Sequence, residues 1–146
     1  MTIETKSLWK AHGGMQGVYT HLSEACACPM TFAVYVPPHA EGRKLPVLWY
    51  LSGLTCTHAN VMEKGEYRKA AAELGVIIVC PDTSPRGEGV ADVPDDWKLG
   101  CGAGFWGDSA EGPAQLVRAG GIDYLVMDYL AEITMSLLAR AKAKRP

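Results

Sequence analysis

The sequence has no apolar segment long enough to cross a membrane, and its first residues contain no apolar core of signal-peptide length. It also lacks an excess of charge of one sign, since 14 basic and 16 acidic side chains leave a formal net charge of −2. No nucleic acid and no anionic membrane is therefore expected as a partner. With 48% hydrophobic and 21% charged residues, the chain is expected to form a single globular domain in the cytoplasm.

Motifs for metals and nucleotides are also missing. Cys26 and Cys28 are separated by one residue, but no second pair of cysteines stands at zinc-ligand spacing. The four histidines form no ligand pattern with the cysteines. Neither GxxxxGK[ST] nor a GxGxxG between a strand and a helix occurs. We therefore expect no metal and no cofactor. The odd number of cysteines, five, indicates reduced thiols, with Cys28 and Cys80 as small buried apolar groups.

The strongest structural signal is the apolar run Leu45–Leu51, which breaks at Ser52-Gly53. Such a run is typical of a parallel strand buried on both faces. After residue 60 the apolar period changes to 3.6, which predicts a helix that Gly75 ends. Val76–Cys80 is then a second doubly buried strand. Strand, helix and strand together predict a right-handed βαβ unit with parallel strands.

The flanking segments differ in character. Alternating apolar residues predict a β-hairpin or meander between residues 15 and 36, which Pro37-Pro38 ends. Residues 82–113 are irregular and rich in glycine, yet they contain aromatic side chains, so we expect them to pack as the rim of a substrate pocket. An apolar stripe predicts a final helix from Ile122 to Leu138, followed by basic residues that suit its C-terminal end.

Five segments, taken together and in order, resemble the S-formylglutathione hydrolase (esterase D) family: CPMTFAVYVPP, LSGLTCT, AAAELG, PDTSPRG and DDWKLGCGAGFWGDS. The likeness runs from about Cys28 to Asp108 and weakens beyond Pro113. It implies an α/β-hydrolase fold and hydrolysis of the thioester S-formylglutathione to glutathione and formate, a step of formaldehyde detoxification. The chain is accordingly interpreted as the N-terminal portion of an α/β-hydrolase fold, with a β-hairpin, then βαβ with parallel strands, then a C-terminal helix.

The resemblance also implies a site. The backbone N–H of Leu54 would be one donor of the oxyanion hole that binds the negative charge on the carbonyl oxygen. Gly53, Cys56, Arg86 and Trp97 are candidates for the substrate pocket. Cys56 matches a family cysteine associated with sensitivity to thiol reagents, and a reactive thiol and an inert buried thiol both stay open. Arg86 and Trp97 have packing or loop pairing as alternative roles.

The catalytic triad of the family is absent. Its serine lies in a G-x-S-x-G elbow and is followed along the chain by aspartate and then histidine. The sequence contains no such elbow, and its last histidine is His58. We therefore expect residues 1–146 to be an incomplete α/β-hydrolase domain that ends before the elbow and contains no catalytic residue. The least favoured hypothesis is that Cys56 or Ser109 replaces the missing nucleophile and makes the chain an active hydrolase.

Two functions follow from this pattern. The first is a truncated homologue of S-formylglutathione hydrolase that is inactive alone, and the alternative is a non-catalytic module that binds a partner through an open sheet edge. The edge arises because the strand at Leu45–Leu51 lacks the neighbour that the α/β-hydrolase order places beside it. Low stability or self-association is the expected consequence.

Overall fold

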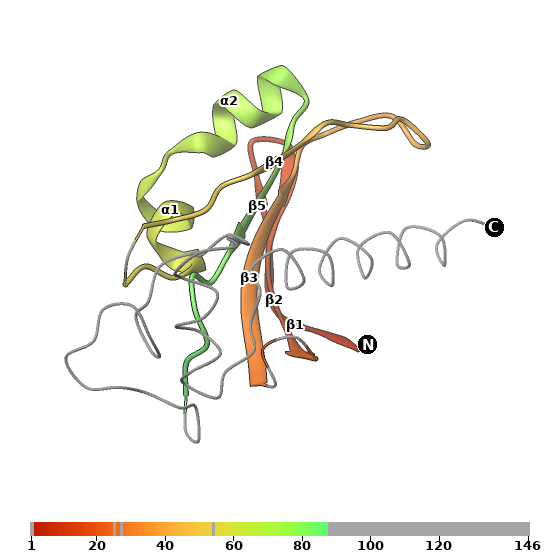
Figure 1. Ribbon diagram of the computed structural model, residues 1–146. Coiled ribbons are helices and arrows are strands. Elements are labelled where there is room, and N and C mark those ends of the chain that lie inside the picture. Colours follow the sequence, from red (N-terminus) through yellow and green to blue (C-terminus); the bar gives the residue numbers. More distant parts are fainter. Residues whose placement is uncertain (1, 25, 27, 54, 88–146) are drawn as a thin grey trace, which may run out of the picture.

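The computed structural model describes residues 2–24, 26, 28–53 and 55–87, which form a mixed five-stranded sheet and two helices (Figure 1). The strands lie in the order β1-β2-β3-β5-β4. In chain order the elements are β1 (Ile3–Ala11), β2 (Gly14–Ser23), β3 (Cys28–Val36), β4 (Val47–Trp49), α1 (His58–Lys64), α2 (Tyr67–Leu74) and β5 (Ile77–Pro81). This partial α/β-hydrolase sheet confirms the predicted fold class in its described part.

The first three strands form an antiparallel meander, of which the alternation between residues 15 and 36 predicted β2 and β3. The register of β2 and β3 runs from Met15 opposite Val36 to Ser23 opposite Cys28. β1 was not predicted, because most of its side chains are exposed and its sequence has no apolar alternation. A two-residue turn joins it to β2, with positive φ at both His12 and Gly13, which suits the twist of a hairpin.

The βαβ unit is present, with β4 and β5 parallel. One difference from the prediction is that two helices, not one, connect these strands. Glu66, at the start of α2, has a left-handed backbone with φ of 51°, so α1 cannot continue directly into α2. Gly75 ends α2 with φ of 68°, as predicted for a glycine cap.

The prediction of a strand at Leu45–Leu51 buried on both faces was wrong in length and burial. The structure has a three-residue strand, β4, at the edge of the described sheet, where Val47 is 49% and Leu48 52% exposed. The order of the strands in the sheet also differs from their order along the chain, in which the prediction described them. The crossover through α1 and α2 places β5 between β3 and β4, so β5 has neighbours on both sides and is the buried strand.

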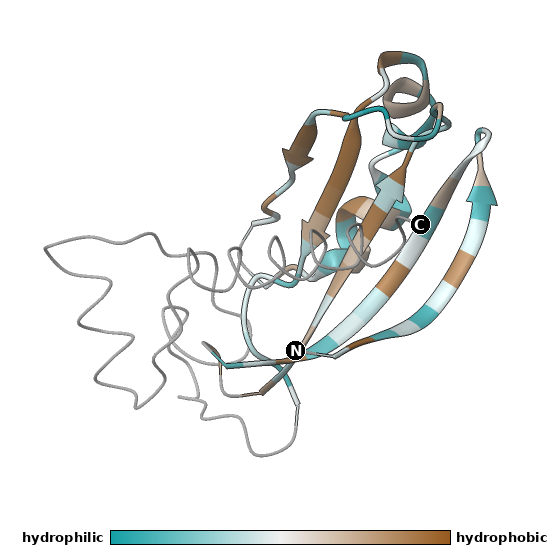
Figure 2. Ribbon diagram, turned by 90° about the vertical axis from the view of Figure 1, so that its right-hand side faces the viewer, coloured by the Kyte–Doolittle hydropathy of each residue, from teal (hydrophilic) through white to brown (hydrophobic). Residues whose placement is uncertain are grey.

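Apolar side chains form one cluster on each face of the sheet. Phe32 and Val79 belong to one cluster, and Ala33, Tyr35 and Cys80 belong to the other, into which α1 and α2 pack with Met62 and Ala71. Figure 2 shows β4 and β5 as mostly hydrophobic, whereas β1 and β2 carry many hydrophilic residues. The most apolar strands therefore belong to the βαβ unit, whose carboxyl ends hold the residues discussed next.

The predicted rim at residues 82–113 is described only as far as residue 87, and the predicted helix from Ile122 to Leu138 lies outside the described residues. In the described part of the chain no helix has the length and apolar character that membrane crossing requires.

Candidate functional site

The candidate site is formed by the segments that follow the parallel strands β4 and β5. In open α/β sheets, ligands bind at the carboxyl ends of such strands. The first segment runs from residue 50 to the start of α1, and the second from residue 82 to residue 87. The two segments lie against each other through hydrogen bonds that tie one loop to the other.

Asp82 makes the first of these connections. One of its carboxylate oxygens accepts from the backbone N–H of His58 at 2.8 Å and from the His58 Nδ1 at 2.6 Å. Both side chains are largely buried, with 19% of the His58 side chain and 10% of the Asp82 side chain exposed. Asp82 thus fixes the first residue of α1 to the end of β5 and orients the imidazole ring.

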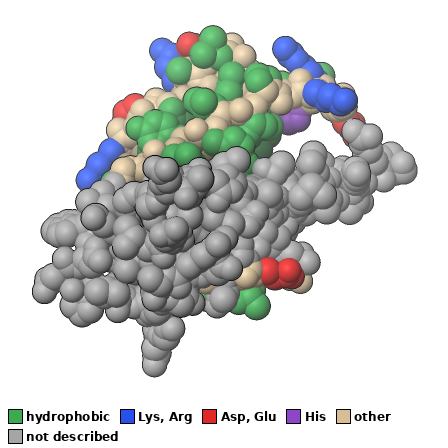
Figure 3. All heavy atoms as spheres, viewed as in Figure 1, with side chains coloured by type: hydrophobic (Ala, Val, Ile, Leu, Met, Phe, Trp, Pro, Cys, Tyr) green, Lys and Arg blue, Asp and Glu red, His purple; other side chains and the backbone are tan. Residues whose placement is uncertain are grey.

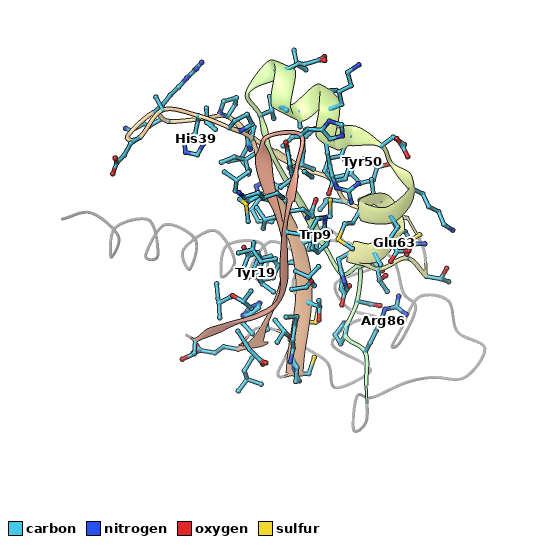
Figure 4. All side chains as sticks on the ribbon, turned by 180° about the vertical axis from the view of Figure 1, so that it is seen from behind. Trp9, Tyr19, His39, Tyr50, Glu63 and Arg86 are labelled. Carbon is cyan, nitrogen blue, oxygen red and sulfur yellow. The ribbon has the colours of Figure 1, made fainter. Side chains whose placement is uncertain are left out.

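Thr83 and Arg86 continue the connection along the same loop. The Thr83 hydroxyl donates to the carbonyl of Cys56. The Arg86 guanidinium donates to the carbonyls of Thr55 and Cys56 at 2.9 and 3.0 Å. Figure 4 shows Arg86 on the segment after β5, on the side of the molecule where α1 lies. Arg86 is therefore a loop-pairing residue, which is one of the two roles left open for it.

The loop between β4 and α1 has a constrained backbone. Thr55 has a left-handed conformation with φ of 64°, which is uncommon for a β-branched residue. Thr57 caps α1, because its hydroxyl accepts from Ala59 N and the Asn60 side chain accepts from Thr57 N. A strained turn followed directly by a capped helix keeps one conformation only when its surroundings hold it. The bonds from the second loop provide that support.

The residues predicted for the substrate pocket differ in exposure, and two of the predicted site residues are not described. Gly53 is exposed, and a Cβ at that position would meet no atom within 4 Å. Cys56 is half-buried, and Arg86 binds the carbonyls beside it. Leu54, the predicted oxyanion donor, and Trp97 lie outside the described residues. The structure thus brings together Gly53, Cys56 and Arg86 at one end of the sheet, and it leaves the oxyanion assignment a prediction.

Cys56 does not form a nucleophile–base pair in the described part of the chain. The His58 side chain bonds only Asp82 there, and the thiol of Cys56 makes no hydrogen bond to it. A cysteine nucleophile needs a base within hydrogen-bond reach or a lowered pKa. Ser52 is buried just after β4 and likewise has no bond to His58. The described residues therefore do not assemble a catalytic centre.

The other cysteines that the structure describes, Cys26, Cys28 and Cys80, belong to the core, as predicted for Cys28 and Cys80. Cys28 is buried and contacts Met30 at 3.8 Å between the sulfur atoms. Burial raises the pKa of the Cys80 thiol to about 11, against an ordinary value of 9.0. Within the described residues no group of three histidine, cysteine or acidic side chains has metal-site geometry.

His58, Asp82 and Thr83 were not identified from the sequence. A signal for them existed, because each lies soon after a predicted parallel strand, and the carboxyl ends of such strands meet at one edge of the sheet. The polar residues that follow Leu45–Leu51 and Val76–Cys80 could therefore have been recognised as neighbours. What the sequence did not specify was which carboxylate pairs with which donor.

Comparison with known proteins gives two family matches. The family described as "Putative esterase" matches residues 23–116, which is more than half of the chain. A second family, described as "Acyclic terpene utilisation family protein AtuA", matches residues 97–146. The esterase match ends close to Pro113, where the likeness in the sequence motifs also weakens. The N-terminal and C-terminal parts of the chain thus match different families, and the two matches overlap at residues 97–116.

Individual relatives agree with the first match. The chain is 55% identical over 113 residues to S-formylglutathione hydrolase of Paracoccus denitrificans and 48% identical over 111 residues to that of Bos taurus. These alignments cover 77% and 76% of this chain but only 40% and 39% of the relatives.

A solved structure of S-formylglutathione hydrolase from Agrobacterium tumefaciens has a TM-score of 0.76 and 52% identity. It is matched over 93% of this chain and 47% of its own. The chain thus spans about 40% of the length of the curated relatives that it matches. With the esterase family model, these relatives and the α/β-hydrolase sheet in agreement, the chain belongs to the S-formylglutathione hydrolase family of esterases.

Proposed function

We propose that this chain is the oxyanion-loop portion of an S-formylglutathione hydrolase and does not hydrolyse the thioester by itself. The observation that carries the proposal is the loop after β4, which the Asp82–Arg86 segment holds at the carboxyl end of the parallel strands. This is where the α/β-hydrolase fold places one donor of its oxyanion hole.

In the chemistry of the complete enzyme, this portion would supply one oxyanion donor but not the nucleophile. An activated serine attacks the thioester carbonyl, a histidine transfers the proton, and an aspartate orients the histidine. Negative charge develops on the carbonyl oxygen, where the N–H of Leu54 would donate. Losing one such donor reduces the rate by roughly 10²–10³, whereas losing the serine removes the mechanism. The elbow that would carry this serine is absent from the sequence.

The cysteines support a reducing compartment, and we propose the cytoplasm. Cys56 and Cys80 are free thiols in the described part of the chain. Thiols that coexist without pairing are typical of cytosolic proteins.

The test is a hydrolysis assay with S-formylglutathione and the 146-residue chain, alongside Cys56→Ser and Ser109→Ala. We expect no turnover above the uncatalysed rate from any of the three proteins. Turnover by the parent chain that either substitution abolishes would contradict the proposal and identify the nucleophile.

A second arm tests the oxyanion loop. The remaining part of the Agrobacterium tumefaciens enzyme, beginning before its nucleophile elbow, is added as a separate polypeptide. We expect turnover to appear only in the mixture, and Arg86→Ala to reduce it because the loop loses two hydrogen bonds. A mixture that forms a folded complex without turnover would contradict the assignment of the loop.

A further inference from the structure

Thr55 has a backbone conformation that its residue type does not favour. Three non-glycine residues of the described chain have positive φ: His12, Thr55 and Glu66. Thr55, with φ of 64°, is the β-branched one. In the left-handed region the Cβ of an L-residue comes too close to the following carbonyl oxygen, and a branched Cβ makes the conformation an outlier. Contacts elsewhere must therefore hold Thr55 in place.

The Thr55 side chain does not provide these contacts. It is exposed and makes no hydrogen bond to any residue that the structure describes. The backbone around it forms a turn, because Cys56 N donates to the carbonyl of Gly53 at 3.1 Å. Thr55 is the third residue of this turn, where a positive φ ordinarily requires glycine or asparagine. A threonine thus occupies a position that suits glycine.

The contacts come from Arg86, on the segment after β5. One guanidinium nitrogen, Nη2, donates to the carbonyl of Thr55 at 2.9 Å and to that of Cys56 at 3.0 Å. The Thr83 hydroxyl donates to the second of these carbonyls. The bond from Arg86 is the one that reaches Thr55 itself. Arg86 therefore links the strained residue directly to the segment that follows β5.

Arg86 makes this link while one of its own donors stays unpaired. Most basic side chains of the described chain are exposed, and Figure 3 shows Lys and Arg side chains at the margins of the described surface. Arg86 is only partly exposed, and its Nε is buried without a hydrogen-bond partner among the described residues. An unpaired buried donor is unfavourable. Two unfavourable local features thus meet in one contact, which is typical of positions kept for function rather than for stability.

We propose that Arg86 is a positioning residue that holds the turn from Gly53 to Cys56 in a strained state. When its bonds to the loop are lost, Thr55 relaxes to negative φ, the region that β-branched residues favour. The turn then moves away from the carboxyl ends of β4 and β5, where open α/β sheets bind ligands. The turn has two states, and Arg86 selects the strained one. This device depends on the turn alone and not on the chemistry proposed above.

A matched pair of glycine substitutions tests the strain. Thr55 and Thr5 are both exposed, but Thr5 lies in β1 and is not among the residues with positive φ. Glycine reaches the left-handed region without a Cβ clash, whereas in a strand it only adds flexibility to the unfolded chain. We therefore expect Thr5→Gly to lower the urea midpoint, and Thr55→Gly to leave it unchanged or raise it. An equal loss in both variants would overturn the proposal.

Labelling of Cys56 tests the role of Arg86. This half-buried thiol lies in the turn, and mass spectrometry of its peptide separates it from the other cysteines. We expect Arg86→Ala to accelerate maleimide labelling about tenfold or more, the typical effect of losing hydrogen bonds from a charged group. Thr55→Asn/Arg86→Ala should label at nearly the parent rate, because asparagine tolerates the left-handed conformation without Arg86.

The double variant separates positioning from packing. If Arg86 only packs against the loop, Thr55→Asn cannot restore slow labelling, so equally fast labelling in Arg86→Ala and in the double variant would contradict the proposal. Labelling of Arg86→Ala at the parent rate would do so as well. Circular dichroism distinguishes a released turn from an unfolded chain, and if Arg86→Ala does not fold, the glycine pair decides. Neither measurement uses turnover, so failure of this proposal is distinguishable from failure of the proposed function.

Discussion

At the scale of single residues, the described structure separates two kinds of cysteine. Cys56 is half-buried in the loop after β4, whereas Cys80 is fully buried on β5. The pKa of the Cys80 thiol is raised to about 11 by burial, so it stays a neutral thiol at physiological pH. Only Cys56 combines partial exposure with a position before a helix among the cysteines that the structure describes.

Cys80 makes the stability of the chain depend on alkaline pH. In the unfolded chain the thiol ionises near its ordinary pKa of 9.0, and in the folded chain near 11. Between these values the folded state binds more protons, so the free energy of unfolding should fall as the pH rises from about 9 to 11. Urea unfolding across this range measures the slope, and Cys80→Ala should reduce it, most clearly below pH 10, because the raised pKa values of Tyr35 and Tyr67 add to it at higher pH. An unchanged slope in that variant would refute the assignment to Cys80.

Asp82 should be more important for stability than an exposed carboxylate. Asp82→Ala leaves the His58 ring and backbone N–H without their acceptor, and we expect a loss of about 1–3 kcal/mol. Glu73→Ala is the control, because Glu73 pairs with Lys69 at 3.9 Å on an exposed helix face and should change stability by less than about 0.5 kcal/mol. Urea midpoints give both values. Equal losses would contradict a special role for the His58–Asp82 pair.

At the scale of elements, a buried polar network joins α2 to the meander. Gln16, on β2, is fully buried, and its amide donates to the carbonyls of Gly17 and Val34 at 3.2 and 3.1 Å. Its side-chain oxygen accepts from the Tyr67 hydroxyl at 2.7 Å and from Arg68 Nε at 3.2 Å. All four hydrogen bonds of the amide are thus made within the protein, and they dock the helix on the sheet.

Substitutions in this network should lower the free energy of unfolding by different amounts. Tyr67→Phe removes one donor, but Arg68 still satisfies the Gln16 oxygen, so we expect a loss of about 1 kcal/mol. Gln16→Leu leaves the hydroxyl of Tyr67 and the guanidinium of Arg68 without this acceptor, and we expect a loss of about 3 kcal/mol or more. Chemical denaturation ranks the two. A larger loss in Tyr67→Phe than in Gln16→Leu would show that the docking does not depend on Gln16.

At the scale of the whole molecule, the described sheet is asymmetric. One edge, β1, is charged and bulged, and the other, β4, is apolar and short. The family relatives are more than twice as long as this chain. In the described part, Arg86 bonds the loop after β4, and the sequence contains no G-x-S-x-G elbow.

The sequence by itself determined the family, the βαβ unit and the glycine that ends its helical connection. These follow from local signals: the apolar runs of β4 and β5, the glycine that ends α2, and the motifs around Ser52 and Asp82. The break between α1 and α2 at Glu66 and the hairpin strand β1 were missed, because a left-handed residue and an exposed strand leave no periodic apolar pattern.

Only the tertiary structure decided which strand is buried and which polar residues meet. Runs as apolar as Leu45–Leu51 and Val76–Cys80 look equivalent in sequence, but the crossover places β5 between two strands and β4 at an edge. Likewise, the pairing of Asp82 with His58 and of Arg86 with the carbonyls before α1 depends on bringing residues more than twenty positions apart to one end of the sheet. Burial and long-range pairing are properties of the assembled sheet, so no local pattern records them.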